Sequence, residues 1–380
     1  MKVLILTMSS GEGHNSFARA ISEECRNRGH EEEVWDIFSY DKLTHAFNEK
    51  GFVLLMKYFR KPYSLVWEYQ IKRDPDKWTT GIFVNSLKKL KKRILEKLAE
   101  CKPDVVICTH YYAADAMSLL VHEGKTSVPF HFVLTDYYTY PNVEVARMAT
   151  RIFVPTSHAV EGVLAQGYRS EQVVVTDGLP VKRGFERCVD KPAMRAKLGL
   201  ADRFTVLVFA GSSGEIPVSK VLKSLEADGP ADMNVVFIAG RNKSERKKIE
   251  RKVKKGLLTK VRVEGFVSNM NEFLAAADLV ICKSSGGALA ECAKVGVPVV
   301  IREKMIINEK RNQQVFMSAD AAVSLDGARC AGKIVSDLAS SKDKLRRLAE
   351  KISAFSSDRA ICNIVDRVEA DFAEINGESR

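Results

Sequence analysis

Short apolar runs alternate along the chain with longer segments in which apolar residues recur at helical spacing. Each run has the length of a buried strand, and several end in a glycine-containing turn. Strands that alternate with helices favour parallel sheets covered by helices, which places the chain in the α/β class. The runs lie at 3–7, 34–38, 103–110, 130–136, 151–156, 173–178, 204–214, 234–240, 261–267, 279–282 and 299–301.

This pattern occurs twice, and a charged connector separates the two copies. The repetition predicts two Rossmann-like, doubly wound domains that face a cleft. We expect a first domain at residues 1–180, a linker at 181–200 and a second domain at 201–340. The last segment, 341–380, has a charged helical pattern, and we expect it to cross back to the first domain.

The most informative turn follows the apolar run 279–282. Residues 283–287 read Lys-Ser-Ser-Gly-Gly, and a helix-forming stretch that contains Glu291 comes next. The free backbone N–H groups and the positive dipole end of a helix N-terminus favour an anion, typically a phosphate. Glu291 would then lie within reach of a ribose hydroxyl. The alternative is a tight turn whose glycines serve packing only.

A similar strand–turn–helix unit opens the chain, where Gly11-Glu12-Gly13-His14 follows the first strand. His14 is expected at a helix N-terminus on the carboxyl edge of a parallel sheet, where α/β proteins keep their sites. The helix dipole disfavours imidazolium there, so the ring would be neutral and able to accept a proton. The alternative is a histidine that caps the helix or packs locally.

Polar residues also end two other strands of the first half. Thr109 and His110 end one, and Thr135 and Asp136 end the other. Because the carboxyl ends of parallel strands share one sheet edge, we expect these residues near His14. Asp136 has three possible roles here: to orient His14, to bind a substrate hydroxyl, or to cap a helix.

The composition is that of a folded chain, with 46% hydrophobic and 28% charged residues. No apolar run approaches the roughly 18–20 residues of a membrane span. The N-terminus reads as a first buried strand rather than a signal peptide. Eight cysteines without a Cys-x-x-Cys pair argue against a zinc site or a disulfide framework, and indicate a reducing cytosol.

Basic residues exceed acidic ones, at 59 Lys plus Arg against 48 Asp plus Glu, and the excess is clustered at 57–61, 88–93 and 241–255. Such clusters attract nucleic acid or an anionic membrane, although the last block, which also contains Glu, fits a solvated helix face. No nucleic-acid-binding module is recognisable, so we expect no nucleic-acid partner.

The segment 43–97 differs from its surroundings because it mixes aromatic and aliphatic residues with Lys and Arg. Aromatic rings suit the headgroup depth of a bilayer, and cations suit its phosphates. We therefore expect peripheral contact with the anionic inner face of the cell membrane. The alternative is two or three amphipathic helices that pack on the sheet.

The order of short motifs resembles one group of enzymes over nearly the whole chain. These are the glycolipid glycosyltransferases that include monogalactosyldiacylglycerol synthases and bacterial processive diacylglycerol glucosyltransferases. They are part of the broader group that contains the peptidoglycan N-acetylglucosaminyltransferase. The motifs are Gly11-Glu12-Gly13-His14, Leu134-Thr135-Asp136, Gly178-Leu179-Pro180-Val181, Gly265-Phe266-Val267, residues 283–291, Gly296-Val297-Pro298 and Asn308-Glu309-Lys310-Arg311-Asn312.

The resemblance implies a GT-B fold with the acceptor site in the first domain and the nucleotide sugar in the second. It implies an inverting transfer of a hexose from a UDP-sugar to diacylglycerol or a glycosyl-diacylglycerol at the cytoplasmic membrane surface. His14 is then the base, and Asp136 is the second catalytic candidate. The implied donor residues are Gly13, then Phe266 and Val267 at uracil, Gly211, Ser212, Ser285, Gly286 and Gly287 at the diphosphate, Glu291 at ribose, and Glu309 and Asn312 at the sugar.

The chemistry of these residue types agrees with such a transfer. A hydroxyl is a poor nucleophile, so a neutral His14 that accepts its proton gives general-base help. Donors at the helix terminus near Ser285 and in the Gly211 loop can stabilise the departing UDP without a metal. We see no Asp-x-Asp motif arranged for magnesium, and we expect neither a metal nor a cofactor beyond the UDP-sugar donor.

Two departures from the family pattern leave specificity open. Relatives usually carry Pro-Gly-Gln-Glu where this chain has Ile306-Ile307-Asn308-Glu309, which leaves the donor hexose undefined. Many relatives also place a histidine and a tryptophan where residues 138–142 stand here, which leaves the acceptor headgroup undefined.

Two other functions fit the same fold. One is a sugar-nucleotide epimerase, which the aromatic and basic segment 43–97 disfavours because an epimerase has no membrane to touch. The other is a non-catalytic, membrane-associated UDP-sugar sensor, which the altered loop at 305–309 leaves open.

Overall fold

The computed structural model describes residues 1–9, 12–37, 74–140, 142–186, 190–209, 216–302, 307–325, 327–328 and 330–377. The chain divides into two compact units. The first unit is Met1–Lys182 together with Ser357–Arg380, and the second is Arg183–Ser356.

The first unit contains a six-stranded parallel sheet in the order β2-β1-β3-β4-β5-β6. The strand order reverses between β1 and β3, and such a switch point is where open α/β sheets place their ligands. The strands are β1 (Lys2–Thr7), β2 (Glu31–Asp36), β3 (Val105–Cys108), β4 (Phe130–Val133), β5 (Arg151–Val154) and β6 (Val173–Val175).

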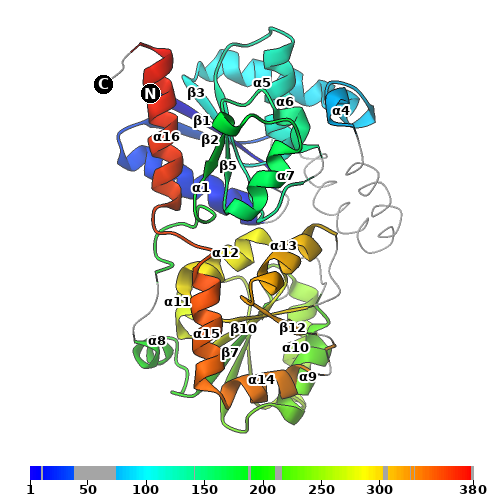
Figure 1. Ribbon diagram of the computed structural model, residues 1–380. Coiled ribbons are helices and arrows are strands. Elements are labelled where there is room, and N and C mark those ends of the chain that lie inside the picture. Colours follow the sequence, from blue (N-terminus) through cyan, green and yellow to red (C-terminus); the bar gives the residue numbers. More distant parts are fainter. Residues whose placement is uncertain are drawn as a thin grey trace. The chain divides into compact units, whose positions relative to one another are not determined.

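Helices cover both faces of this sheet (Figure 1). They are α1 (Glu12–Asn27), α4 (Ile82–Ser86), α5 (Lys88–Cys101), α6 (Tyr111–His122), α7 (Val160–Leu164) and α16 (Ala360–Ile375). Four 3-10 turns accompany them in the described residues, namely η1 (Pro75–Lys77), η2 (Val143–Ala146), η3 (Ser157–Ala159) and η4 (Ser170–Gln172).

The second unit repeats this plan with the order β12-β11-β10-β7-β8-β9, again all parallel, and with its switch point between β7 and β10. Its strands are β7 (Phe204–Phe209), β8 (Met233–Ile238), β9 (Val261–Glu264), β10 (Leu279–Cys282), β11 (Val299–Arg302) and β12 (Val323–Leu325). Its helices are α8 (Lys191–Lys197), α9 (Val218–Asp228), α10 (Lys243–Lys254), α11 (Met270–Ala276), α12 (Gly286–Val295), α13 (Ile307–Ser318), α14 (Ala331–Ala339) and α15 (Lys342–Ser353).

Continuous apolar runs form these strands because a parallel sheet is buried on both faces. Val3, Ile5 and Ile107 are fully buried in the first core, and Val206, Leu279 and Ile281 are fully buried in the second. The prediction of two Rossmann-like domains is therefore confirmed, while the cleft between them stays a prediction.

The domain boundaries differ from those expected in two places. The expected linker 181–200 contains α8, which belongs to the second unit because Arg195 and Lys191 both bond Asp278, at 2.6 and 3.1 Å. The segment 341–380 does not return as one piece. Its first helix, α15, stays with the second unit because Leu345 and Leu348 pack on that core.

Only α16 returns to the first unit, as the sequence led us to expect of a C-terminal helix. It packs beside α1 (Figure 1), and its Ile364, Val365 and Val368 are fully buried in the first core. Asp371 on the same helix is a buried charge bonded by Arg151, Arg367 and His131.

Residues 43–73 of the expected membrane-facing segment 43–97 lie outside the described residues. The part that is described includes α5, whose Leu90, Ile94 and Leu98 are buried. Helix packing on the first unit therefore accounts for the apolar face of α5. None of the helices described here is long and apolar enough to cross a membrane.

Candidate functional site

The turn after β1 places His14 as the third residue of α1. The neighbouring Asn15 holds this turn, because it accepts a hydrogen bond from the Thr7 hydroxyl at 3.2 Å and donates one to the Ser9 hydroxyl at 2.7 Å. Gly13 precedes His14 on the same helix and is partly exposed. The sequence pattern thus located the start of the helix correctly.

The His14 ring is held through one of its two nitrogens. Its Nδ1 lies 3.0 Å from the Thr109 carbonyl oxygen and 3.0 Å from Thr135 Oγ1. A carbonyl oxygen only accepts hydrogen bonds, so this pattern assigns the proton of a neutral ring to Nδ1. The lone pair then lies on Nε2, which is the nitrogen left to accept a proton from a substrate.

Burial lowers the pKa of His14, and the hydrogen bond to the Thr109 carbonyl opposes this shift only in part. The lowered pKa agrees with the neutral ring that the sequence predicted. Its main cause is burial, whereas the sequence argument relied on the helix dipole. A neutral imidazole at physiological pH is the protonation state that a general base requires.

His110 lies against His14, with ring centroids 4.7 Å apart. It is the N-cap of α6, where its side chain accepts a hydrogen bond from the Tyr112 amide at 3.2 Å. Burial lowers its pKa well below the usual range, and a proton on His14 would lower it further. Both histidines are therefore neutral, which avoids a like-charge pair.

Tyrosines surround these two rings, and the sequence reasoning did not single them out as site residues. Tyr111 stacks on His110 at 4.6 Å and lies 5.8 Å from Tyr140, while Tyr138 meets Tyr140 edge-on at 5.7 Å. Their positions directly after β3 and β4 were the sequence feature that could have identified them as site residues. Such rings form an aromatic wall beside the histidine pair.

Asp136 is partly exposed and follows Thr135 at the same sheet edge. Thr135, rather than Asp136, contacts the His14 nitrogen. Burial raises the pKa of Tyr140, and the charge of Asp136 raises it further. The structure thus gives the orienting contact to Thr135, and a role for Asp136 at a substrate hydroxyl stays a prediction.

In the second unit the glycine turn lies between β10 and α12. Ser285 is the N-cap of α12, but its side chain makes no capping hydrogen bond. The Leu289 amide bonds the Ser285 carbonyl at 3.0 Å, so the amides of Gly286 and Gly287 have no partner inside the helix. This is the arrangement of donors that the sequence predicted for a phosphate.

Glu309 and Asn312 on α13 hold this turn in place. Glu309 pairs with Lys283, and its backbone carbonyl accepts a hydrogen bond from the Ser284 hydroxyl at 2.6 Å. The Asn312 amide donates to the Ser284 carbonyl at 3.0 Å. Both side chains are buried, at 6% and 0% exposure, so the structure supports a bracing role, and contact with a donor sugar stays a prediction.

The structure describes three of the remaining predicted donor residues and leaves two undescribed. Glu291 is the sixth residue of α12 and is partly exposed. Phe266 follows β9 with 59% of its surface exposed, and the Arg241 guanidinium lies 5.1 Å from its ring. Val267 is partly exposed. Gly211 and Ser212 lie outside the described residues.

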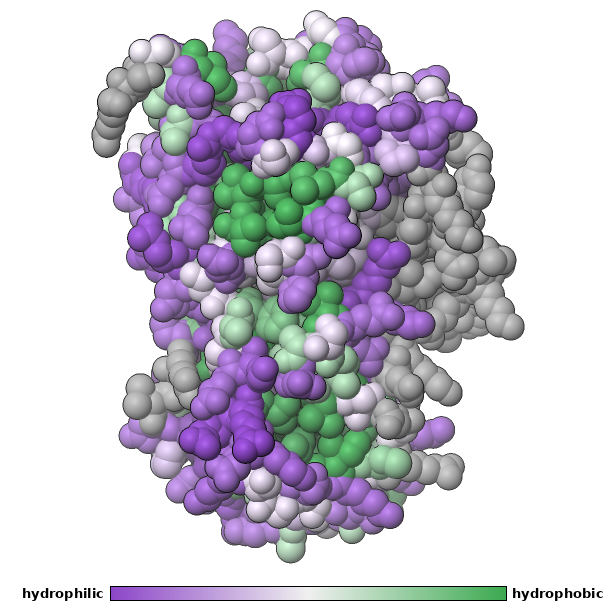
Figure 2. All heavy atoms as spheres, viewed as in Figure 1, coloured by the Kyte–Doolittle hydropathy of each residue, from purple (hydrophilic) through white to green (hydrophobic). Residues whose placement is uncertain are grey.

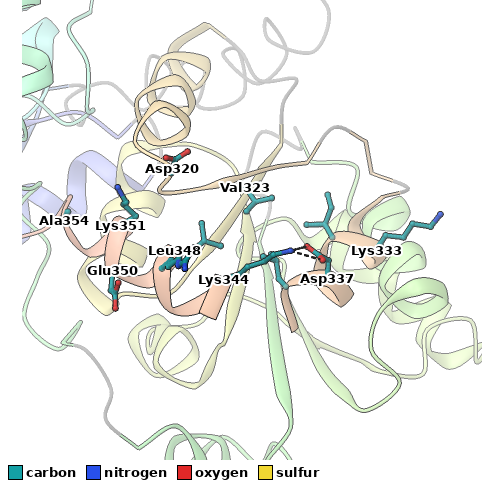
Figure 3. Close-up of a pocket in the computed structure, with 12 residues that line it drawn as sticks. Asp320, Val323, Lys333, Asp337, Lys344, Leu348, Glu350, Lys351 and Ala354 are labelled. Carbon is teal, nitrogen blue, oxygen red and sulfur yellow. Dashed lines mark hydrogen bonds and ion pairs between the residues drawn. The ribbon is translucent and has the colours of Figure 1, made fainter. Parts of the chain in front are cut away.

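A groove of about 860 Å³ lies elsewhere on the second unit, and no predicted donor residue lines it. Val323, Leu348 and Ala354 contribute apolar surface, and Lys344 pairs with Asp337 beside them (Figure 3). Figure 2 shows apolar surface next to hydrophilic side chains on the face that α15 crosses. The groove is therefore separate from the candidate site.

Comparisons with known proteins agree with this architecture. Residues 14–181 match the model for monogalactosyldiacylglycerol (MGDG) synthase, and residues 205–365 match that for the glycosyltransferase family 28 C-terminal domain. A processive diacylglycerol beta-glucosyltransferase of Bacillus mycoides is 27% identical over 373 residues, covering 97% of this chain and 94% of the relative.

Solved structures show the same fold at lower identity. MurG of Acinetobacter baumannii is 15% identical with a TM-score of 0.61, over 97% of this chain and 99% of that one. The UDP-GlcNAc 2-epimerase of Neisseria meningitidis, bound to UDP-GlcNAc, is 16% identical with a TM-score of 0.62, over 97% and 100%. These likenesses establish the GT-B fold.

Proposed function

The chain belongs to the glycosyltransferases that combine an MGDG synthase domain with a family 28 C-terminal domain, and on that premise we propose its reaction. It transfers a hexose from a UDP-sugar to diacylglycerol or a glycosyl-diacylglycerol, with inversion and without a metal. The reaction takes place on the cytoplasmic face of the cell membrane. The name of the relative at 27% identity supports the lipid acceptor.

The observation that carries this proposal is the Nε2 of a neutral His14, which bonds no residue that the structure describes while Nδ1 is held. The acceptor hydroxyl attacks the anomeric carbon of the donor while its proton passes to Nε2. The bond from that carbon to the UDP oxygen breaks in the same displacement, so the configuration inverts. The amides of Gly286 and Gly287 face the charge that develops on the departing diphosphate.

The direct test incubates the pure protein with diacylglycerol vesicles and a panel of UDP-sugars, then identifies the lipid products by mass. We expect one UDP-hexose to give hexosyl-diacylglycerol. Release of an epimerised UDP-sugar without a lipid product would favour the epimerase function instead. UDP-sugar binding with no product from any donor would favour a non-catalytic sensor.

Glu291 is expected to bind the ribose of the donor. Glu291→Gln should weaken UDP affinity by about 1–3 kcal/mol, because a hydrogen-bonded carboxylate is lost. Isothermal titration of UDP measures this directly. Glu350→Gln, in the separate groove of the second unit, serves as the control and should leave UDP affinity unchanged. Equal affinity in both variants would contradict the ribose assignment.

The described surface that best suits an anionic membrane is the start of α5. Lys88, Lys89 and Lys92 are all exposed there, and none pairs with another residue that the structure describes. Exposed lysines near a bilayer contribute about 1 kcal/mol each to binding of anionic lipid. These lysines lie in the first unit, where the acceptor lipid is expected to bind.

Reversing these three charges should remove most of the vesicle binding. Lys88→Glu, Lys89→Glu and Lys92→Glu together should lower affinity for phosphatidylglycerol vesicles at least tenfold in co-sedimentation, since they remove about 3 kcal/mol of attraction. The control reverses three exposed lysines of the second unit, Lys247, Lys254 and Lys255, for the same change in net charge. An equal loss in both triple variants would show that only total charge matters.

A further inference from the structure

The orientation of His14 depends on a residue that no motif singled out as catalytic. Thr135 Oγ1 lies 3.0 Å from His14 Nδ1 and also 3.0 Å from the Tyr140 hydroxyl. Thr135 and Tyr140 are 3% and 5% exposed, so neither hydroxyl can exchange these partners freely for water. The three side chains form a short hydrogen-bonded row behind the reactive nitrogen.

The direction of the hydrogen bonds in this row can be assigned from its acceptors. The Thr135 backbone N–H donates to the Tyr140 oxygen at 2.9 Å, which leaves the phenol proton available to Thr135 Oγ1. Burial raises the pKa of Tyr140, so the phenol keeps that proton. Thr135 Oγ1 can then accept from both Tyr140 and the Nδ1–H of His14.

We propose that Thr135, held by Tyr140, is a positioning residue that fixes the ring orientation of His14, whose Nδ1–H tautomer the Thr109 carbonyl sets. The alternative tautomer would face its Nδ1 lone pair towards the Thr109 carbonyl oxygen at 3.0 Å, which is repulsive. When Nε2 takes a proton, both oxygens at Nδ1 stabilise the resulting imidazolium, because hydrogen bonds to a charged donor are stronger.

Neutral oxygens at Nδ1 have a different effect from the carboxylate of a Ser-His-Asp triad. A carboxylate would stabilise the imidazolium strongly and raise the histidine pKa. Thr135 and the Thr109 carbonyl orient the ring with a weaker effect on its pKa, so burial still keeps the resting base neutral. This catalytic consequence rests on the proposed function, but the ring orientation of His14 is a property of the free protein.

The test measures the tautomer of His14 and the hydrogen bonding at its Nδ1 directly. Nitrogen-15 NMR of histidine-labelled protein, with the His14 signals assigned from His14→Gln, should show a single Nδ1–H tautomer in the wild type and in Thr135→Ser. Thr135→Val, which keeps the shape but loses the hydroxyl, should keep this tautomer and shift the Nδ1 signal, because one of the two acceptors at Nδ1 is lost. Tyr140→Phe should give a smaller shift. An Nε2–H wild type, or a Thr135→Val spectrum equal to wild type, would overturn the proposal.

The kinetic constants kcat and KM give a second measurement. They would not change in this way if Thr135 had only a structural role. Thr135→Val should lower kcat about tenfold, the loss expected for one hydrogen bond, with the KM for the UDP-sugar unchanged. Thr135→Ser should restore most of kcat. If the protein transfers no sugar at all, the proposed function fails, while the NMR experiment still decides the role of Thr135.

Discussion

Replacing His14 with glutamine is expected to lower kcat about 10²–10⁴-fold, the usual contribution of a positioned general base. Glutamine can place an amide near the position of Nε2, but it has no basic lone pair there. Because His14 lies in the first unit and the predicted diphosphate turn in the second, UDP affinity should stay near the wild-type value. Transfer assays and isothermal titration of UDP give the two measurements.

The pH dependence of the wild type provides an internal check. The pKa of His14 is lowered by burial, so the ring is neutral and active above its ordinary value of about 6.5 and loses activity only at lower pH. We expect kcat/KM to be level near neutrality and to fall on the acid side. The residual activity of His14→Gln should lack that acid limb.

A matched substitution separates this effect from a general loss of histidine. His158 is exposed on η3, and His158→Gln should leave both kcat and the acid limb intact. Full turnover in His14→Gln would remove His14 from the mechanism. A limb that persists in His14→Gln would assign it to another group, and His110, at 4.7 Å, is the nearest candidate.

The positions of strands and glycine turns could be predicted from sequence because parallel strands are buried on both faces. Such burial requires uninterrupted apolar runs, as at 279–282, and leaves glycine turns at their carboxyl ends. The same logic brought Thr109, His110 and Thr135 to the edge that carries His14, and the distances of 3.0 and 4.7 Å confirm it.

The contacts inside the site could not be predicted, because hydrogen-bond partners depend on side-chain direction rather than on spacing. A carboxylate next to Thr135 was the natural candidate to orient His14, yet the hydroxyl of Thr135 holds that place. Likewise, the bonds of Glu309 to Lys283 and of Asn312 to Ser284 could not be predicted from the sequence, and their contact with a donor sugar stays a prediction.

The sequence pattern also could not show how much of the C-terminal segment 341–380 packs on the first unit. Both α15 and α16 are amphipathic, and periodicity alone does not tell which core a helix covers. The difference lies in specific partners. Leu345 and Leu348 of α15 pack on the second core, whereas Asp371 of α16 bonds Arg151 and His131 of the first sheet.

Removing the Asp371 carboxylate is therefore expected to destabilise the first unit strongly. Asp371 is 2% exposed, and it accepts hydrogen bonds from Arg151 at 2.8 Å and from His131 at 3.0 Å. Asp371→Ala leaves the largely buried Arg151 charge without its partner, and breaking such a pair costs about 3–5 kcal/mol. Urea unfolding followed by tryptophan fluorescence measures the change in the free energy of unfolding.

The fluorescence reports on the intended unit because all three tryptophans, at positions 35, 67 and 78, belong to the first unit. Asp366→Ala on the same helix is the matched control. Asp366 is 46% exposed where it pairs with Arg28, so its loss should cost at most about 1 kcal/mol. Equal losses in the two variants would mean that the apolar face of α16, and not the buried charge cluster, holds the returning helix to the first sheet.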